Sequence, residues 1–362
     1  MVKIVKAWMN RYFADEEALL LLLLLAAGFT VVLTMGTVLA PMIASVIFAY
    51  LMQGIVNRLR NYGLPHWVAV TSAFSIFVFG LIGFLVFMLP LLGRQITRLA
   101  SELPVMLNQW KQSLLLLVEE YPEFISQDQL QQIVQSAGTD LGSLGQSLVS
   151  FSVSSVPALI TALIYLILVP ILVFFFLKDG EKMLSWWASF LPQRRPIMTQ
   201  VWSEMNLQVA NYVRGKVIEL LVVGIVSIIA FYLLGLQYAL LLGLLVGLSV
   251  IVPYIGAAVV TIPVLLIGVF QWGWSPEFWW LMAVYGVIQA LDGNVLVPLL
   301  FSEVNKLHPV VIILAVLVFG GLWGFWGVFF AIPLATLVKA VFSAWPRDIA
   351  AIEDSTASVS QD

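Results

Sequence analysis

Long apolar runs separated by short polar stretches dominate the pattern of this chain of 362 residues. A helix needs about 20 consecutive apolar residues to cross a bilayer. Runs of that kind predict membrane segments at residues 18–36, 38–56, 67–92, 155–177, 217–235, 237–271, 277–300 and 308–343. The sixth and eighth runs are too long for one straight span, and each is interrupted. We therefore expect an all-α polytopic membrane protein of about eight membrane segments, two of them interrupted or re-entrant hairpins.

The two interruptions are rich in glycine and proline. Val-Pro-Tyr-Ile-Gly at 252–256 divides the sixth run, and Gly-Gly-Leu-Trp-Gly at 320–324 divides the eighth. Each divided run is either two full spans or two half-helices of a re-entrant hairpin, and the sequence leaves both alternatives open. The pairs Gly243/Gly247 and Gly320/Gly324 have the small-xxx-small spacing of closely packed membrane helices.

The stretch 93–154 has a different periodicity. Apolar residues recur three and four positions apart from Leu92 to Leu114, stop before Pro122 and resume from Leu130 to Leu148. This pattern predicts two amphipathic helices, so we expect 93–154 to form a helical extracytoplasmic domain. The apolar stripes of these helices pack either on each other or between copies of the chain.

A second polar stretch, 178–216, carries Trp186, Trp187, Phe190 and Trp202 among basic residues. Tryptophan favours the headgroup region of a bilayer. We expect a cytoplasmic amphipathic segment that lies in the interface.

Composition supports membrane residence. Apolar residues make up 61% and charged residues 10% of the chain, whereas soluble domains have about 45–50% and about 25%. The net charge of −3 gives no basic field for nucleic acid. There is no cysteine, and His66 and His308 lie far apart, so we expect no metal site. Nucleotide-binding and hydrolase motifs are also missing, so we expect no cofactor, no catalytic residue and no enzymatic activity.

Loop charges predict the orientation. Most Lys and Arg residues fall at the N-terminus, in 178–216 and near the C-terminus, which places both termini in the cytoplasm. The predicted layout is then N-terminal membrane helices at 1–92, the extracytoplasmic domain at 93–154, a fourth membrane helix at 155–177, the interfacial segment at 178–216, a C-terminal membrane region with broken helices at 217–345 and a cytoplasmic tail at 346–362.

Polar residues within the C-terminal apolar runs are the candidates for function. A broken backbone at membrane depth is tolerated where it is buried in protein or lines a wet cavity, and Pro253 and Gly256 border such a break. Asp292 is a costly carboxylate in this setting, and Gln289 shares a helix face with it. Alternatively, the break is a tight turn at the membrane surface and the polar residues fix helix packing.

Glu219 and His308 have simpler explanations as well. Glu219 follows Arg214 and Lys216, so a snorkelling interfacial ion pair accounts for it without a functional role. His308 precedes a proline, as is typical of a turn, although its titration near neutral pH would also suit a protonation switch.

These motifs together resemble the autoinducer-2 exporter family. The resemblance rests on Pro-Tyr-Ile-Gly at 253–256, Gln-Ala-Leu-Asp-Gly-Asn at 289–294 with Pro298, His-Pro at 308–309, the glycine-rich break at 320–324, Ile-Pro at 332–333, and the stretches 173–179 and 211–216. It implies about eight membrane segments, cytoplasmic termini, the bacterial inner membrane and a homo-oligomer, expected to be a pentamer. Some members are described as exporting autoinducer-2, and others as sodium(lithium)/proton antiporters.

The sequence thus predicts a secondary transporter or permease that moves a small polar solute or signal. We expect its path to include Pro253, Tyr254, Gly256, Gln289, Asp292, Asn294, Pro298, His308 and Glu219. In an antiporter, Asp292 would exchange a proton for a monovalent cation with the help of Glu219. The rival from another class is a non-transporting membrane scaffold or regulator built around the 93–154 domain.

Overall fold

The computed structural model describes residues 16–120, 156–301 and 307–345, with side chains for 16–106, 160–301 and 307–345. This part of the chain is helical almost throughout and contains no strand. It includes seven helices that are long and apolar enough to cross a membrane, together with two shorter apolar helices. The expected all-α polytopic class is therefore confirmed.

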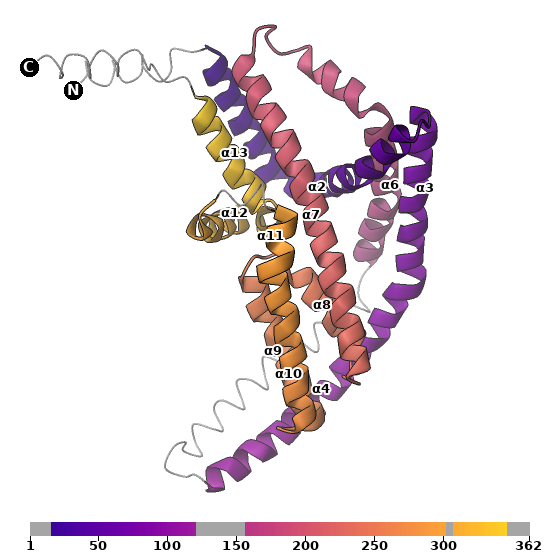
Figure 1. Ribbon diagram of the computed structural model, residues 1–362, viewed down its shortest axis with the longest axis vertical. Coiled ribbons are helices and arrows are strands. Elements are labelled where there is room, and N and C mark those ends of the chain that lie inside the picture. Colours follow the sequence, from indigo (N-terminus) through magenta and orange to yellow (C-terminus); the bar gives the residue numbers. More distant parts are fainter. Residues whose placement is uncertain (1–15, 121–155, 302–306, 346–362) are drawn as a thin grey trace, which may run out of the picture. The chain divides into compact units, whose positions relative to one another are not determined.

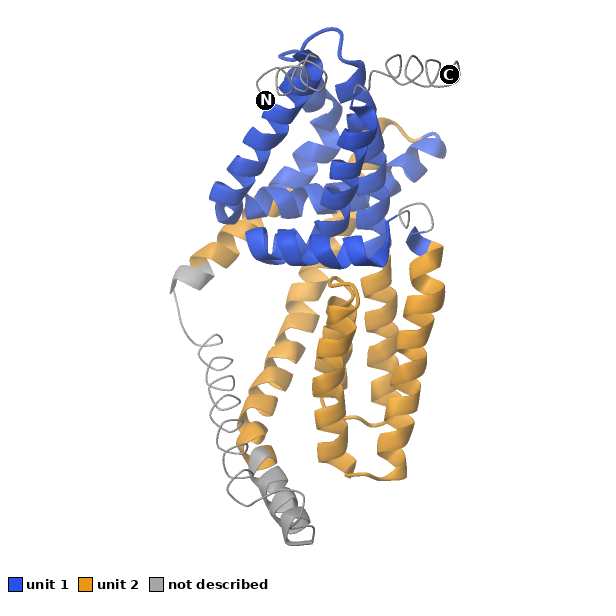
Figure 2. Cartoon of the chain, turned by 90° about the vertical axis from the view of Figure 1, so that its left-hand side faces the viewer, with its two compact units in different colours: residues 1–63, 171–216, 300–362 blue, residues 64–170, 217–299 orange. Residues whose placement is uncertain are grey.

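The chain divides into two compact units (Figure 2). The first unit comprises residues 1–63, 171–216 and 300–362, and the second comprises 64–170 and 217–299. Three helices, which are labelled in Figure 1, contribute residues to both units: α6 (Val156–Ala188), α7 (Pro196–Leu233) and α11 (Val297–Phe301). Each unit is described separately below.

The first unit begins with α2 (Glu16–Asn61), a helix of 46 residues. Its length exceeds the need of one span, and it bends at Met35, where φ is −116° and ψ is 15°. The hydroxyls of Thr30 and Thr34 donate to the carbonyls of Ala26 and Thr30, both at 2.8 Å, and such back-bonding favours bending. The two runs expected at 18–36 and 38–56 are therefore joined by a bend rather than by a loop.

The C-terminal apolar run forms α12 (Pro309–Phe329) and α13 (Ala331–Ala344). Gly324 has φ 58° and ψ −136°, which permits a sharp bend within α12. A Cβ at Gly324 would meet nothing within 4 Å, so this glycine supplies backbone freedom rather than the close packing expected of it. The Tyr212 hydroxyl of α7 donates to the Phe329 carbonyl at 2.7 Å and so binds the turn between the two helices.

The core of the second unit lies between α7, α8 (Ala239–Ser249), α9 (Ile255–Trp272) and α10 (Pro276–Leu291). Leu242, Val246, Val264 and Leu281 are at most 1% exposed there. A Cβ at Gly247 would lie 2.8 Å from the Cα of Gly224 in α7. The close packing expected at Gly243 and Gly247 is therefore confirmed, because only glycine lets these two backbones approach so closely.

The second unit also contains the continuous run of α3 (His66–Gly83), the π-helical turn η1 (Phe84–Met88) and α4 (Leu89–Glu120). No break separates the expected span from the expected extracytoplasmic domain at residue 93, and residues 121–155 lie outside the described part of the chain. The Tyr238 hydroxyl, just before α8, donates to the Glu102 carboxylate of α4, and the Leu241 N–H donates to Gln95 Oε1 at 2.8 Å. Burial and the Glu102 carboxylate both raise the pKa of Tyr238.

The stretch 178–216 does not form a separate element. It is divided between the end of α6, a turn, and the start of α7. Exposed Trp186, Trp187 and Phe190 pack edge to face near that turn, with ring centroids of Trp186 5.0 Å from Trp187 and 4.9 Å from Phe190. An exposed aromatic cluster of this kind suits the headgroup region of a bilayer.

Candidate functional site

The break in the sixth apolar run is a tight turn between α8 and α9 in the second unit. The Ile255 N–H donates to the Pro253 carbonyl at 2.7 Å, and Tyr254 between them has φ 63° and ψ −49°. These values are close to those of the classic γ-turn, which is rare and strained. The Tyr254 side chain is 61% exposed, so it projects away from the hairpin.

Gly256 allows α9 to start directly beside the end of α8. A Cβ at this position would lie 1.8 Å from the backbone oxygen of Ser249, a distance that no side-chain adjustment can relieve. With 11 residues, α8 is about 16 Å long, whereas a hydrocarbon core is about 30 Å thick. The sixth run is thus a short helix followed by a longer one of 18 residues, and α8 is too short to be a full span.

A polar network joins α9 to α10 within otherwise apolar sequence. Gln289 Nε2 donates to the Tyr285 hydroxyl at 3.2 Å, which lies 2.9 Å from Thr261 Oγ1. The Thr261 hydroxyl donates to the Ala257 carbonyl at 2.7 Å. Because Thr261 uses its single hydroxyl proton in the bond to Ala257, the Tyr285 hydroxyl must be the donor in its bond to Thr261. The hydrogen bonds therefore run in one direction, with Gln289 and Tyr285 of α10 donating toward α9.

The network differs in burial from one end to the other. Tyr285 is 3% exposed and packs against Phe231 with ring centroids 6.2 Å apart, whereas Gln289 is half-buried. Among the described residues the Gln289 amide makes no hydrogen bond other than the one to Tyr285. Its carbonyl oxygen and second N–H therefore retain binding capacity.

Asp292 stands at the first position of the π-helical turn η2 (Asp292–Leu296), between α10 and α11. Its side chain is half-buried, and its backbone carbonyl accepts from the Val297 N–H. Pro298 explains the wider turn, because a proline has no N–H to donate to the carbonyl four residues earlier and its ring crowds that carbonyl. Turns of this kind are frequent at functional sites.

The residues near Asp292 are not all drawn together. Asn294 is exposed, and its Nδ2 donates to the Ala290 carbonyl of its own helix at 2.8 Å. Pro298 is exposed. Gln289 and Asp292 do follow Tyr285 at intervals of four and three residues, so the three share one face of the helix.

Glu219 and His308 lie at other helices, α7 and α12. Glu219 is 2% exposed and Lys216, one turn earlier on α7, is 5% exposed. Burial of both does not fit a snorkelling pair, because snorkelling requires charged groups that reach water, whereas Arg214 is half-buried. Lys216 Nζ lies 5.3 Å from the centroid of the Phe301 ring, a cation–π contact. His308 belongs to the first unit, is exposed and caps α12, with its Nδ1 accepting from the Val310 N–H at 3.3 Å.

Tyr285, Thr261 and the Ala257 carbonyl were not expected from the sequence. Tyr285 lies four residues before Gln289, so helical spacing from that residue would have identified it. Thr261 had no such signal, because its role depends on the packing of α9 against α10. In the described part of the chain, no three His, Cys, Asp or Glu side chains are grouped so that they could hold a metal ion.

Comparison with known proteins adds independent information. A family model described as "AI-2E family transporter" matches residues 19–347. The Escherichia coli (strain K12) protein named "Putative permease PerM" is 46% identical over 346 residues, which cover 96% of this chain and 98% of that protein. Two Bacillus subtilis (strain 168) proteins are similar over 85% of this chain. "Putative transport protein YrrI" is 26% identical over 87% of its own length, and "Putative transport protein YueF" is 28% identical over 84% of its own length. The similarity therefore includes both units.

Proposed function

The chain belongs to the AI-2E transporter family, and from that premise we propose that it is a secondary transporter whose solute passes along the polar face shared by α9 and α10. The coarser statement, a multi-pass membrane transport protein of the bacterial inner membrane, follows from the family and the apolar helices. The path and the class of solute are the parts that we propose.

The observation that carries the proposal is the Thr261–Tyr285–Gln289 network. Polar groups at membrane depth are costly, and they usually face protein or water. Here two hydroxyls and an amide interact with one another, and the half-buried amide keeps a free donor and a free acceptor. Such groups suit a small solute that carries hydroxyl or carbonyl groups.

Asp292 adds a carboxylate one turn beyond Gln289. It would contact a hydroxyl of the solute or a coupling cation. The strained turn at Tyr254 and the close approach at Gly256 hold α9 in position beside α8. The proposal further includes cytoplasmic termini and a homo-oligomer, expected to be a pentamer, which native mass spectrometry of the purified protein can count.

Flux into liposomes tests the path. The purified protein would be reconstituted and assayed with a panel of polar metabolites, autoinducer-2 and monovalent cations. Tyr285→Phe and Thr261→Val each remove one hydroxyl from the network. Matched controls are Tyr232→Phe, whose side chain is 76% exposed on α7, and Thr71→Val, whose hydroxyl donates to its own helix.

We expect the two network variants to lower flux about tenfold, because a hydrogen bond to the moving solute is worth about 1–1.5 kcal/mol. The controls should retain the flux of the unmodified protein. Equal flux in all four, with normal size-exclusion profiles, would exclude this path. Asp292→Asn tests coupling separately: sodium or lithium exchange for protons that persists in this variant would exclude Asp292 as the coupling group.

A further inference from the structure

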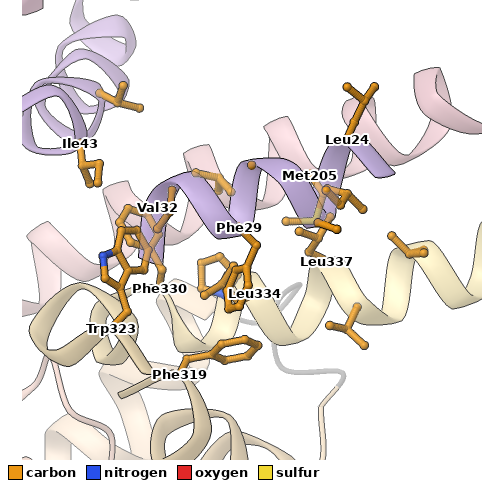
Figure 3. A pocket seen from close by; sticks show the side chains of 18 of the residues that line it. Leu24, Phe29, Val32, Ile43, Met205, Phe319, Trp323, Phe330, Leu334 and Leu337 are labelled. Carbon is orange, nitrogen blue, oxygen red and sulfur yellow. The ribbon is translucent and has the colours of Figure 1, made fainter. Parts of the chain in front are cut away.

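The first unit contains a cavity that the proposed polar path does not use. Its volume is about 820 Å³, and residues of α2, α7, α12 and α13 line it. Figure 3 shows Phe29 and Val32 of α2 facing it from one side, with Leu334 and Leu337 of α13 opposite. All of the lining residues belong to the first unit.

Two bends and several aromatic contacts shape the cavity. α2 bends at Met35 and α12 bends at Gly324. Beside the bend of α2, the Trp323 indole packs against Gly36, where a Cβ would lie 2.5 Å from Trp323 Nε1. The Phe29 and Phe319 rings meet edge to face with centroids 6.4 Å apart. These contacts lie along the walls of the cavity, since Phe29, Phe319 and Trp323 are all among its lining residues.

The lining residues are apolar, which excludes a polar solute, since such a solute would lose its hydrogen bonds to water without replacement. The cavity is open rather than enclosed, so in a membrane protein the hydrocarbon of the bilayer can reach its apolar walls. An engineered apolar cavity of about 150 Å³ already binds benzene, and the cavity here is roughly five times larger. Its occupant is therefore a long hydrocarbon group.

The surroundings indicate the source of that group. The cavity is formed within a multi-pass membrane protein, and its edge includes the exposed side chains Leu22, Leu24, Val338 and Phe342. Lys339 is also exposed, and it directly follows Val338 in α13. Lys339 is not itself a lining residue, but a lysine next to an apolar surface of a membrane helix extends its ammonium group toward the headgroup region, where lipid phosphates lie.

We propose that this cavity binds one acyl chain of a membrane phospholipid, whose phosphate lies at Lys339. The lipid would fill the space between the first part of α2 and α13 and would stabilise the bends at Met35 and Gly324. This site is separate from the path along α9 and α10, so failure of either proposal leaves the other intact.

Gly28 offers a direct way to fill the cavity. It lines the cavity, and a Cβ there would meet nothing within 4 Å, so Gly28→Phe places a ring where the acyl chain would lie. Gly80→Phe is the matched control, because Gly80 also has open space around it but lies on α3, outside the cavity. The full-length protein, delipidated in detergent, would be titrated with phosphatidylglycerol and monitored by native mass spectrometry.

We expect one tightly bound phosphatidylglycerol per chain in the unmodified protein and in Gly80→Phe, with at least about tenfold weaker binding in Gly28→Phe. Lys339→Ala should weaken binding of phosphatidylglycerol but not of hexadecanol, which has a long hydrocarbon chain and no charge. Equal binding by the two glycine variants would overturn the site. Hexadecanol that binds as tightly as phosphatidylglycerol, without any effect of Lys339→Ala on either ligand, would overturn the phospholipid as occupant.

A second measurement does not depend on any variant. A phosphatidylglycerol with a photoreactive group at the end of its acyl chain would be cross-linked to the unmodified protein. We expect the labelled peptides to come from 22–46 and 319–342, which line the cavity. Labelling spread evenly over all apolar helices would contradict a defined site.

Discussion

Gly256→Ala should destabilise the second unit, because it places a methyl group against the backbone of the preceding helix. The added Cβ would lie 1.8 Å from the Ser249 oxygen and 2.7 Å from the Ser249 carbonyl carbon. Real Cβ atoms essentially never approach closer than 3.0 Å, so α8 and α9 must separate by about 1 Å at their tightest point. The atom in the way is a backbone carbonyl that is fixed at the end of α8, and no rotamer change can move it.

The magnitude follows from two opposing effects. Overpacking of this kind typically costs 1–3 kcal/mol, and the rigid obstacle places this case near about 3 kcal/mol. Replacing glycine by alanine also restricts the unfolded chain, which stabilises the fold by about 0.4–1 kcal/mol. The net expected loss is about 2 kcal/mol, which lowers the melting temperature of a unit of this size by about 4–8 °C.

Thermal unfolding of the purified protein in detergent, followed by tryptophan fluorescence, measures this loss. Gly286→Ala on α10 is the control, because a Cβ there meets nothing within 4 Å, and it should be neutral or stabilising by up to about 1 kcal/mol. Adding Ser249→Ala to Gly256→Ala should not restore stability, since the obstacle is the backbone oxygen. A melting temperature for Gly256→Ala equal to that of Gly286→Ala would refute the reasoning.

Two further changes can be measured in the same unfolding assay. Gly324→Ala should destabilise the bend in α12 by about 1–3 kcal/mol, because φ of 58° with ψ of −136° is unfavourable for any residue with a side chain. Gly321 has open space and no positive φ, so Gly321→Ala should not destabilise the bend. Equal effects of the two changes would contradict a backbone role for Gly324. Tyr238→Phe should lower the free energy of unfolding by about 1 kcal/mol, because it removes the hydrogen bond to the partly exposed Glu102 carboxylate. If this loss is no larger than that of Tyr232→Phe, a change at an exposed tyrosine, the hydrogen bond contributes nothing to stability.

Positions that depend on local chemistry could be predicted from the sequence. The break at 252–256 follows from proline and glycine in an apolar run, and the structure has a turn there; the proline after His308 likewise coincides with the start of α12. The close approach at Gly243 and Gly247 follows from their spacing. These features depend on a few neighbouring residues, and for that reason they are readable without knowledge of the fold.

Positions that depend on packing could not be predicted. Glu219 was interpreted as an interfacial residue because Arg214 and Lys216 precede it, yet the surrounding chain buries it almost completely. Thr261 lies among apolar residues of α9 and acquires its role only when Tyr285 is placed beside it. The bend of α2 at Met35 likewise has no residue in its own turn that predicts it: Pro41 lies six residues further on, and the threonine back-bonds and the indole at Gly36 become visible only in the structure.

The π-helical turns lie between these two cases. η1 ends at Met88 and η2 ends at Leu296, each two residues before a proline, Pro90 or Pro298. In both places the proline removes one N–H donor, and the helix widens in the turn just before it. Pro170 and Pro263 lie inside α6 and α9 without a π-turn, so a proline in an apolar helix shows where the backbone can deviate but does not by itself predict a π-turn.

The hydrogen-bond network between α9 and α10 determines how the proposed path would work. Tyr285 and Thr261 satisfy each other when no solute is bound, so a solute that enters must exchange hydrogen bonds with them rather than fill vacant ones. Exchange of that kind gives a modest net affinity, about 1 kcal/mol for each hydrogen bond, and a transported solute must bind weakly enough to leave. The half-buried Gln289 amide would make the first contact and the buried Tyr285 hydroxyl the second. The polar face of α10 is therefore better suited to passage than to tight retention.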